Sequence, residues 1–100
     1  MKFYYSNPVD RRLATIHYRK IQRGLCAICL IDIGMDKRDG ECIDHDHNTD
    51  LIRGLLCKRC NFVLGWAKDD STILRMAAEY LEKTHKKEDY ALAKQYKGWL

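Results

Sequence analysis

The chain has 100 residues, is 46% hydrophobic and 32% charged, and carries a formal net charge of +4 with a single proline. This length fits one domain with a modest core, and the composition excludes disordered and repeat proteins. No apolar run is long enough for a membrane helix, and the first residues lack the apolar stretch of a secretory signal. We therefore expect a cytoplasmic protein without a membrane partner, in which paired cysteines bind metal more often than each other.

The charges are unevenly distributed along the chain. Residues 1–29 carry six lysines and arginines against one aspartate, residues 30–56 carry seven acids against three bases, and residues 57–100 are basic again. Basic flanks would suit a nucleic-acid partner, and an acidic middle would suit a hard cation. Taken alone, however, the pattern favours an ordinary solvated surface.

The N-terminal part predicts an amphipathic helix from about residue 8 to residue 23, after an aromatic-rich leader without a clear period. Asn7 can cap this helix, Pro8 suits its first position, and Gly24 ends it. The apolar positions form a helical stripe of Val9, Leu13, Ile16 and Ile21. The remaining surface carries candidate phosphate contacts, for which a solvated basic face is an equal alternative: Arg11, Arg12, Arg19, Lys20 and Arg23.

Two Cys-x-x-Cys pairs, Cys26 with Cys29 and Cys57 with Cys60, are separated by 27 residues. Four thiolates make a closed tetrahedral zinc site, which is structural because no position stays open for chemistry. A redox motif, which needs only one pair, and chance buried cysteines are the alternatives, and the pairing and spacing favour zinc. Cys42 is left over and is expected to be a small buried strand residue.

A strand–strand–helix unit is expected around the second cysteine pair. Residues 30–40 predict a loop that ends in an Asp-Gly turn, and residues 41–45 and 51–56 predict the two strands of a hairpin. A short helix follows to about residue 68, and its apolar residues are expected to face the hairpin: Phe62, Val63 and Trp66.

Two further helices are expected beyond this unit. A cap cluster of Asp and Ser/Thr residues precedes a helix over about residues 71–85, whose i, i+4 apolar stripe is typical of a packing helix. A last helix is expected over about residues 88–98, packed on the core or on a second subunit. All these elements are expected to form one domain covering residues 1–100.

The sequence Asp44-His45-Asp46-His47, between the cysteine pairs, carries the candidate chemistry. Phosphodiester hydrolysis needs a base, for which a neutral imidazole is suited, and a cation for the developing charge. Asn61 can add a second oxygen ligand to Asp44, which leaves most of a magnesium shell to water and substrate. Neighbouring strand residues point to opposite faces, so a bend must bring Asp44 and His45 together. Solvated turn residues, or histidines that replace a cysteine at zinc, are the alternatives.

Three motifs in this order resemble the recombination endonuclease VII family of phage: Gly24-x-Cys26-x-x-Cys29, the Asp-His-Asp-His group, and Arg53-Gly-Leu-Leu-Cys57-x-x-Cys60-Asn61. That family belongs to the ββα-metal (His-Me finger, HNH-like) nucleases, and the similarity covers about residues 24–82. The resemblance implies an α+β fold with a zinc-stabilised ββα-metal core over about residues 41–68. It also implies roles for individual residues: magnesium held by Asp44 and Asn61, His45 as general base, His47 assisting, and structural zinc held by Cys26, Cys29, Cys57 and Cys60.

The resemblance further implies a homodimeric endonuclease that cuts branched DNA, including Holliday junctions, and leaves a 5′-phosphate and a 3′-hydroxyl. A phage-encoded enzyme would act in the cytoplasm of the bacterial host. Arg53 matches a family position and joins Lys58 and Arg59 as a candidate DNA contact, with a salt bridge on the strand surface as the alternative for Arg53. The chain lacks the long C-terminal helical region of the best-known family type, so a dimer would use the N-terminal helix, residues 71–85 or the terminal segment.

Two other functions stay open from the sequence. An HNH-like nicking endonuclease would act on ordinary duplex DNA, and a non-catalytic zinc-stabilised module would bind DNA without cutting it. The joint presence of Asp44, His45 and Asn61 favours an enzyme, because a simple binder does not need all three. Magnesium is the expected catalytic ion, although manganese would accept the same ligands.

Overall fold

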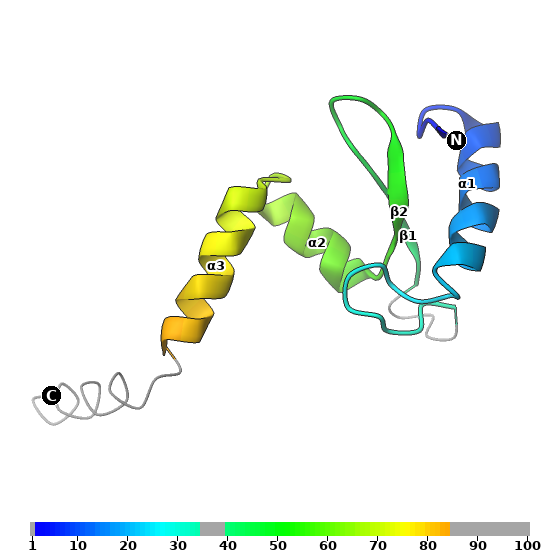
Figure 1. Ribbon diagram of the computed structural model, residues 1–100. Helices are drawn as coiled ribbons and strands as arrows, with labels where there is room; N and C mark the ends of the chain where they lie inside the picture. The colour runs from blue at the N-terminus through cyan, green and yellow to red at the C-terminus, as the bar shows by residue number, and fades with distance from the viewer. Residues whose placement is uncertain (1, 35–39, 85–100) are drawn as a thin grey trace, which may run out of the picture. The chain divides into compact units, whose positions relative to one another are not determined.

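The computed structural model describes residues 2–34 and 40–84 (Figure 1). In these ranges the chain order is α1 (Pro8–Ile21), β1 (Cys42–His45), β2 (Ile52–Leu56), α2 (Lys58–Trp66) and α3 (Ser71–Thr84). The α+β class is therefore confirmed, and the helix expected over residues 88–98 lies outside the described residues. The chain divides into two compact units, residues 1–66 and the segment from residue 67 onward. The single domain stays a prediction.

Helix α1 begins where the sequence predicts, because Asn7 caps it. The side-chain oxygen of Asn7 accepts hydrogen bonds from the backbone N–H groups of Val9 and Asp10 at 2.9 and 3.2 Å. The helix ends at Ile21, two residues before the predicted end. Arg23 and Gly24 follow in left-handed backbone with φ of 56° and 72°, a conformation that glycine adopts without strain and that closes the helix.

The packed face of α1 differs from the predicted apolar stripe. Ala14 is the buried residue of the helix, whereas the stripe residues Val9, Leu13, Ile16 and Ile21 are all exposed. Phe3 and Ile52 pack directly on Ala14. The bulky groups of this contact thus come from the leader and the hairpin, and the helix contributes a methyl group that lets them approach closely.

The hairpin contains a β-bulge at Arg53. Asp44 pairs with Gly54, but the next residue, His45, pairs with Ile52, so Arg53 is an extra residue in β2. Such a bulge bends the strand and shifts the alternation of its side chains and backbone groups. The bulge lies beside Asp44 and His45, and the convergence of these two side chains on one site stays a prediction.

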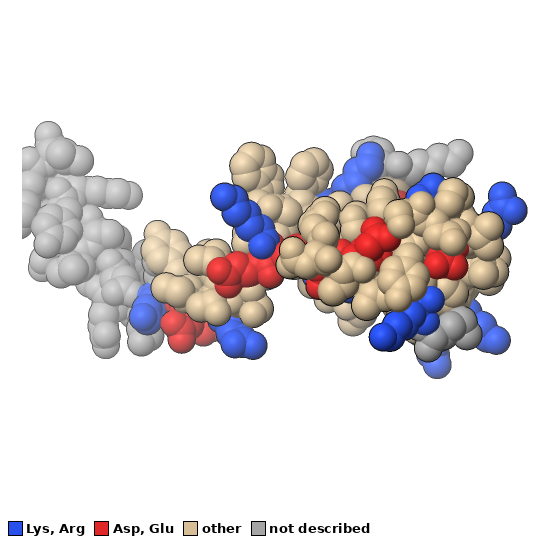
Figure 2. Space-filling view, turned by 90° about the horizontal axis from the view of Figure 1, so that it is seen from above, with Lys and Arg blue, Asp and Glu red and all other residues tan. Residues whose placement is uncertain are grey.

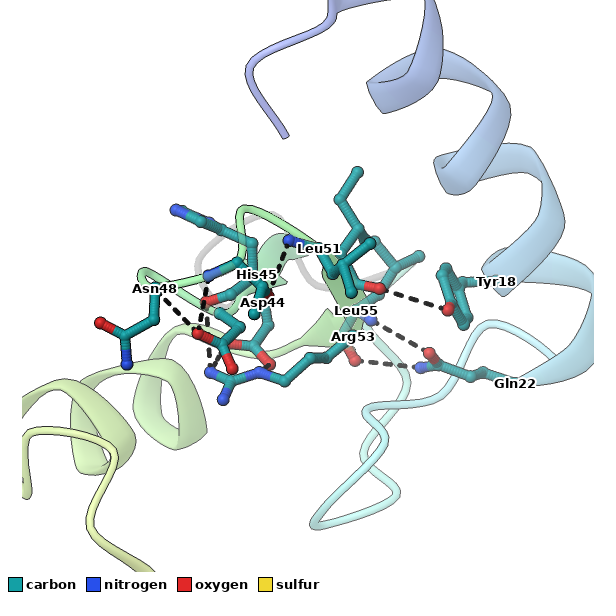
Figure 3. A network of polar contacts seen from close by, with 11 residues as sticks. Tyr18, Gln22, Asp44, His45, Asn48, Leu51, Arg53 and Leu55 are labelled. Atoms are coloured by element: carbon teal, nitrogen blue, oxygen red, sulfur yellow. Dashed lines mark hydrogen bonds and ion pairs between the residues drawn. The ribbon is translucent and has the colours of Figure 1, made fainter. Parts of the chain in front are cut away.

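The outer edge of β2 is paired with two segments that are distant in sequence. The leader is one of them, because Tyr4 forms an antiparallel bridge with Leu51 and the N–H of Ile52 donates to the carbonyl of Phe3 at 2.9 Å. The Gln22 side chain is the other: its oxygen accepts from the N–H of Leu55 and its amide donates to the Leu55 carbonyl, both at 3.0 Å (Figure 3). The odd spacing from Ile52 to Leu55 along one edge is what a one-residue bulge produces.

Helix α2 presents a different face to the core from the one expected. Cys60 and Leu64, one turn apart, pack against the cluster of Cys26, Leu55 and Cys57. Phe62, Val63 and Trp66 are exposed within the described residues, so the expectation that they face the hairpin is wrong. The position of the cysteine pair explains the difference, because turning the Cys60 sulfur inward also turns Leu64 inward and directs the other three residues away.

Helix α3 belongs to the second unit and starts at the predicted cap cluster. The carboxylate of Asp70 accepts hydrogen bonds from the N–H groups of Thr72 and Ile73 at 2.9 and 3.3 Å. These bonds satisfy two of the free donors of the first turn. Asp70 is therefore the capping residue of the cluster.

Candidate functional site

The four paired cysteines meet in one cluster. The sulfur atoms of Cys26, Cys29, Cys57 and Cys60 all lie within 4.8 Å of one another. The Cys29 and Cys57 sulfurs are 3.7 Å apart, and a zinc tetrahedron with bonds of about 2.3 Å has an edge of about 3.8 Å. The cluster therefore fits a zinc ion, and no histidine of the described residues belongs to it.

Backbone hydrogen bonds prepare this cluster for thiolate formation. Burial alone would raise the pKa of Cys26, but the N–H groups of Cys57, Cys29 and Ile28 outweigh it and lower that pKa. Burial and hydrogen bonds with the other cysteines raise the pKa of Cys60. A bound cation would favour the deprotonated form of all four sulfurs.

Cys42 stands apart from the cluster, as expected. It lies in β1 opposite Leu56 and is partly buried. Burial, as the largest effect, raises the pKa of its thiol. A raised pKa keeps this cysteine a neutral thiol, which suits a packing role.

Asp44 is nearly buried and is held by Arg53. Asp44 is 8% exposed, and both of its carboxylate oxygens accept hydrogen bonds from the Arg53 guanidinium at 2.8 Å (Figure 3). Arg53 also donates to the carbonyl of His45 at 3.2 Å. Arg53 thus forms a salt bridge on the strand, which was the alternative to its role as a DNA contact. Each carboxylate oxygen keeps a second acceptor position, so Asp44 can still serve as a cation ligand.

The His45 ring contacts two other rings. The Tyr5 ring stacks on it with centroids 3.8 Å apart and an interplanar angle of 5°. The His47 ring meets it edge-on at 4.6 Å and 66°. The structure thus brings the two candidate histidines together, and it adds Tyr5, which the sequence analysis did not single out. No local motif marks Tyr5; the one signal was the aromatic content of the leader.

Asn61 lies in the first turns of α2, directly after Cys60. Its N–H donates to the Cys57 carbonyl at 3.0 Å, which fixes it to the cysteine cluster. Helix α2 packs against β1, the strand that carries Asp44. Asp44 and Asn61 therefore lie on elements in contact, and together they offer only oxygen donors, which suit magnesium. Their joint use as magnesium ligands stays a prediction.

The predicted DNA contacts have different surroundings. Their positions are α1 for Arg11, Arg12, Arg19 and Lys20, the turn after α1 for Arg23, β2 for Arg53, and the first turn of α2 for Lys58 and Arg59. Arg19 pairs with Glu41, whose hydrogen bond and charge raise the pKa of the guanidinium. Arg11, Arg12 and Arg19 border one surface hollow of about 480 Å³.

One face of the larger unit shows acidic and basic side chains in different places. Figure 2 shows acidic side chains near the middle of the visible face of this unit, with lysine and arginine side chains projecting at its margins. The same order is present in the sequence, where an acidic middle has basic flanks.

The comparisons with known proteins agree with the motifs. A family model described as recombination endonuclease VII matches residues 3–83. The chain is 46% identical over 65 residues to the gene 59 protein of Mycobacterium phage D29, covering 64% of this chain and 38% of that protein. It is 46% identical over 63 residues to the gene 59 protein of Mycobacterium phage L5, covering 62% and 37%. The chain thus spans well under half the length of these relatives.

No solved structure matches the chain. None of the helices within residues 2–34 and 40–84 combines the length and the apolar character that crossing a membrane requires.

Proposed function

The chain belongs to the recombination endonuclease VII family, and from this premise we propose that it is a magnesium-dependent endonuclease that hydrolyses phosphodiester bonds in branched DNA. The products would carry a 5′-phosphate and a 3′-hydroxyl. One observation supports this proposal above the others: Asp44 and His45 adjoin a β-bulge, on the hairpin that leads into the cysteine cluster.

In this proposal His45 is the general base. A neutral imidazole takes the proton of the attacking water, and such a base typically contributes a factor of about 100 to 10,000 in rate. His47, in edge contact with His45, assists at the phosphate or at the leaving group.

Asp44 and Asn61 would hold the magnesium ion. When bound, the ion stabilises the charge that develops on the phosphate and on the leaving oxygen. Asp44 contributes the negative charge and Asn61 a neutral oxygen, while Arg53 keeps the Asp44 carboxylate oriented through its two hydrogen bonds. Manganese would be accepted by the same ligands.

The zinc ion would have a structural role that reaches the catalytic ligands. Cys60 and Asn61 are consecutive residues of α2, so the zinc that binds Cys60 also fixes the position of Asn61. Contacts that orient the ligands of a metal ion from behind commonly affect its affinity and its activity.

The proposed assembly is a homodimer acting in the cytoplasm of a bacterial host, because the relatives are phage proteins and the family implies a dimer on DNA. Arg12, Lys20, Arg23, Lys58 and Arg59 would contact phosphates and position the DNA without reading its sequence.

The test compares cleavage of a four-way junction with cleavage of a linear duplex of the same sequence in the presence of magnesium. We expect the wild type to cut the junction preferentially. His45→Ala should lower the cleavage rate by about 100-fold or more and leave the affinity for the junction unchanged. His17→Ala, which removes a histidine of α1 that contacts Phe3 and Tyr18, is the matched control and should cut normally.

Three results would contradict parts of the proposal. Full cleavage by His45→Ala would refute the assigned base. Equal cutting of both substrates by the wild type would favour the nicking enzyme, and binding without any cutting would favour the non-catalytic module.

A further inference from the structure

The leader is bound to the loop that follows β1, and several contacts hold it there. The N–H of Tyr5 donates to the carbonyl of Asp50 at 2.8 Å. The N–H and the hydroxyl of Ser6 both donate to the Asp50 carboxylate, at 3.0 and 2.5 Å. On the other side of Tyr5, Phe3 is buried against Ala14. Tyr5 is therefore fixed on both sides by its neighbours in the chain.

Successive residues of the leader differ in burial. Phe3 and Tyr5 both pack in the cluster formed with Ala14 and Ile52, whereas Tyr4 between them is 43% exposed. Phe3 fills the core, and Tyr5, at its edge, covers His45. Tyr5 itself lies in a turn that leads into α1, since the N–H of Asn7 donates to the Tyr4 carbonyl at 3.2 Å.

The contact with His45 is a stack with almost parallel rings, 3.8 Å apart at 5°. Arg11 restrains the same tyrosine, because its guanidinium donates to the Tyr5 carbonyl at 2.5 Å and its central carbon lies 5.4 Å from the ring centroid. A stacked neighbour fixes the plane of an imidazole and covers one face of it, while the ring nitrogens remain at the edge.

We propose that Tyr5 is a positioning residue, which holds the His45 imidazole in the orientation needed to take a proton from water. The inference rests on the proposed function, in which His45 is the base. An imidazole linked through two rotatable bonds has several orientations, and a base that samples them is aimed correctly only part of the time. A displacement of about 1 Å at a reacting group can cost about 100-fold in rate.

This proposal makes the N-terminal leader part of the nuclease site. The leader supplies no ligand and no base. It contributes the aromatic ring that stacks in parallel on His45, and the pairing with Asp50 and Leu51 determines where this ring lies.

The experiment compares Tyr5→Ala, Tyr5→Phe and the control Tyr4→Ala, which removes an aromatic ring from the adjacent, exposed position. Single-turnover cleavage of a four-way junction at saturating protein gives the rate, and a binding titration without magnesium gives the affinity. The chemical shifts of the His45 ring protons report the stack directly, because a facing aromatic ring displaces them. Thermal melting and zinc content show whether each variant folds.

We expect Tyr5→Ala to lose about tenfold to 100-fold in cleavage rate, with unchanged DNA affinity and zinc content and with altered His45 ring shifts. Tyr5→Phe should keep the stack and most of the rate, and Tyr4→Ala should resemble the wild type in every measurement.

Several outcomes would overturn the inference. Unchanged His45 shifts in Tyr5→Ala would show that the stack is absent, and an unchanged rate would show that it has no positioning role. A Tyr5→Phe rate as low as that of Tyr5→Ala would assign the effect to the hydroxyl group instead.

These results can be separated from a failure of the proposed function. If His45→Ala cuts DNA normally, the assigned base is wrong and the positioning role falls with it. If His45→Ala is inactive and Tyr5→Ala is fully active, the function stands and only the inference about Tyr5 fails.

Discussion

The ion pair of Asp44 and Arg53 links the candidate magnesium ligand to the bulge. Arg53 is the extra residue of β2, and its guanidinium takes up both oxygens of a carboxylate that is 8% exposed. A bidentate pair of this kind is directional as well as attractive. The bulge therefore has a chemical effect, since its extra residue places a positive charge next to the Asp44 carboxylate.

Replacing Arg53 should leave the buried negative charge of Asp44 unpaired and thereby destabilise the fold. In Arg53→Ala the nearly buried Asp44 loses two charge-assisted hydrogen bonds, and we expect a loss of about 1–3 kcal/mol in the free energy of unfolding. Urea denaturation measures it. Arg53→Ala combined with Asp44→Asn should recover part of the loss, because the uncompensated charge is gone.

The exposed Arg12→Ala is the matched control and should stay close to the wild type. If Arg53→Ala unfolds at the same urea concentration as Arg12→Ala, the pair does not stabilise the fold.

The leader is the element that the sequence left without a structure, and its attachment depends on a carboxylate. The hydroxyl of Ser6, as the largest effect, and then its N–H lower the pKa of Asp50. A carboxylate with a lowered pKa contributes stability above the ordinary pKa of about 3.9. The contribution is lost as the pH falls through the lowered value.

The attachment of the leader should therefore be sensitive to acid. We expect the His45 ring shifts caused by Tyr5 to persist at pH 5 and to diminish well below pH 4, as Asp50 takes up a proton. Asp50→Asn should weaken the attachment at neutral pH and remove this acid-dependent part. Ser6→Ala should reduce it too, because the hydroxyl donor, the larger of the two causes of the lowered pKa of Asp50, is lost while the backbone N–H remains.

Proton titration of the shifts by NMR is the measurement. If the His45 ring shifts caused by Tyr5 diminish at the same pH in the wild type and in Asp50→Asn, this role of Asp50 is contradicted.

Local chemistry explains which features of the elements and the site were predictable. The cysteine pairs, the Asn7 cap and the turn-bounded hairpin depend on residues close in sequence, and all were found near their expected positions. Tyr5 on His45 and Gln22 on Leu55 join segments that are distant in sequence. No periodicity marks such contacts, so only the fold reveals them.

The errors in the packed faces have the same origin. The stripe of α1 predicted an apolar face, but the leader brought Phe3 onto Ala14 instead. On α2, the cysteine cluster determined the rotation of the helix in place of its aromatic residues. Periodicity identifies a helix, and the partner decides which of its faces is buried.

At the scale of the whole molecule, the cysteine cluster accounts for much of the small core. Cys26 and Cys57 are fully buried beside Leu55, Leu56 and Ile33. Without a cation these positions place thiols, not packed hydrocarbon, at the centre of the larger unit. A core of this size commonly needs a metal to be stable.

Removing zinc should therefore unfold the larger unit. Zinc binding to such sites supplies on the order of 10 kcal/mol, so Cys57→Ser or a strong chelator should abolish cooperative thermal unfolding. Circular dichroism follows the transition and a zinc assay follows the metal. Cys42→Ser is the matched control, because Cys42 lies outside the cluster, and it should keep both zinc and stability. A Cys57→Ser variant that melts like Cys42→Ser would refute the structural role of zinc.

The covered outer edge of β2 has a further consequence, for self-association. A two-stranded sheet exposes backbone groups that can recruit a strand from another copy and start aggregation. Here Phe3 and Tyr4 occupy the edge near Ile52, and Gln22 together with the N–H of Ala27 occupies it at Leu55. The leader thus also shields this part of the β2 edge from edge-to-edge pairing, and a chain that lacks the residues before Ser6 would expose the backbone groups near Ile52 to a strand of another molecule.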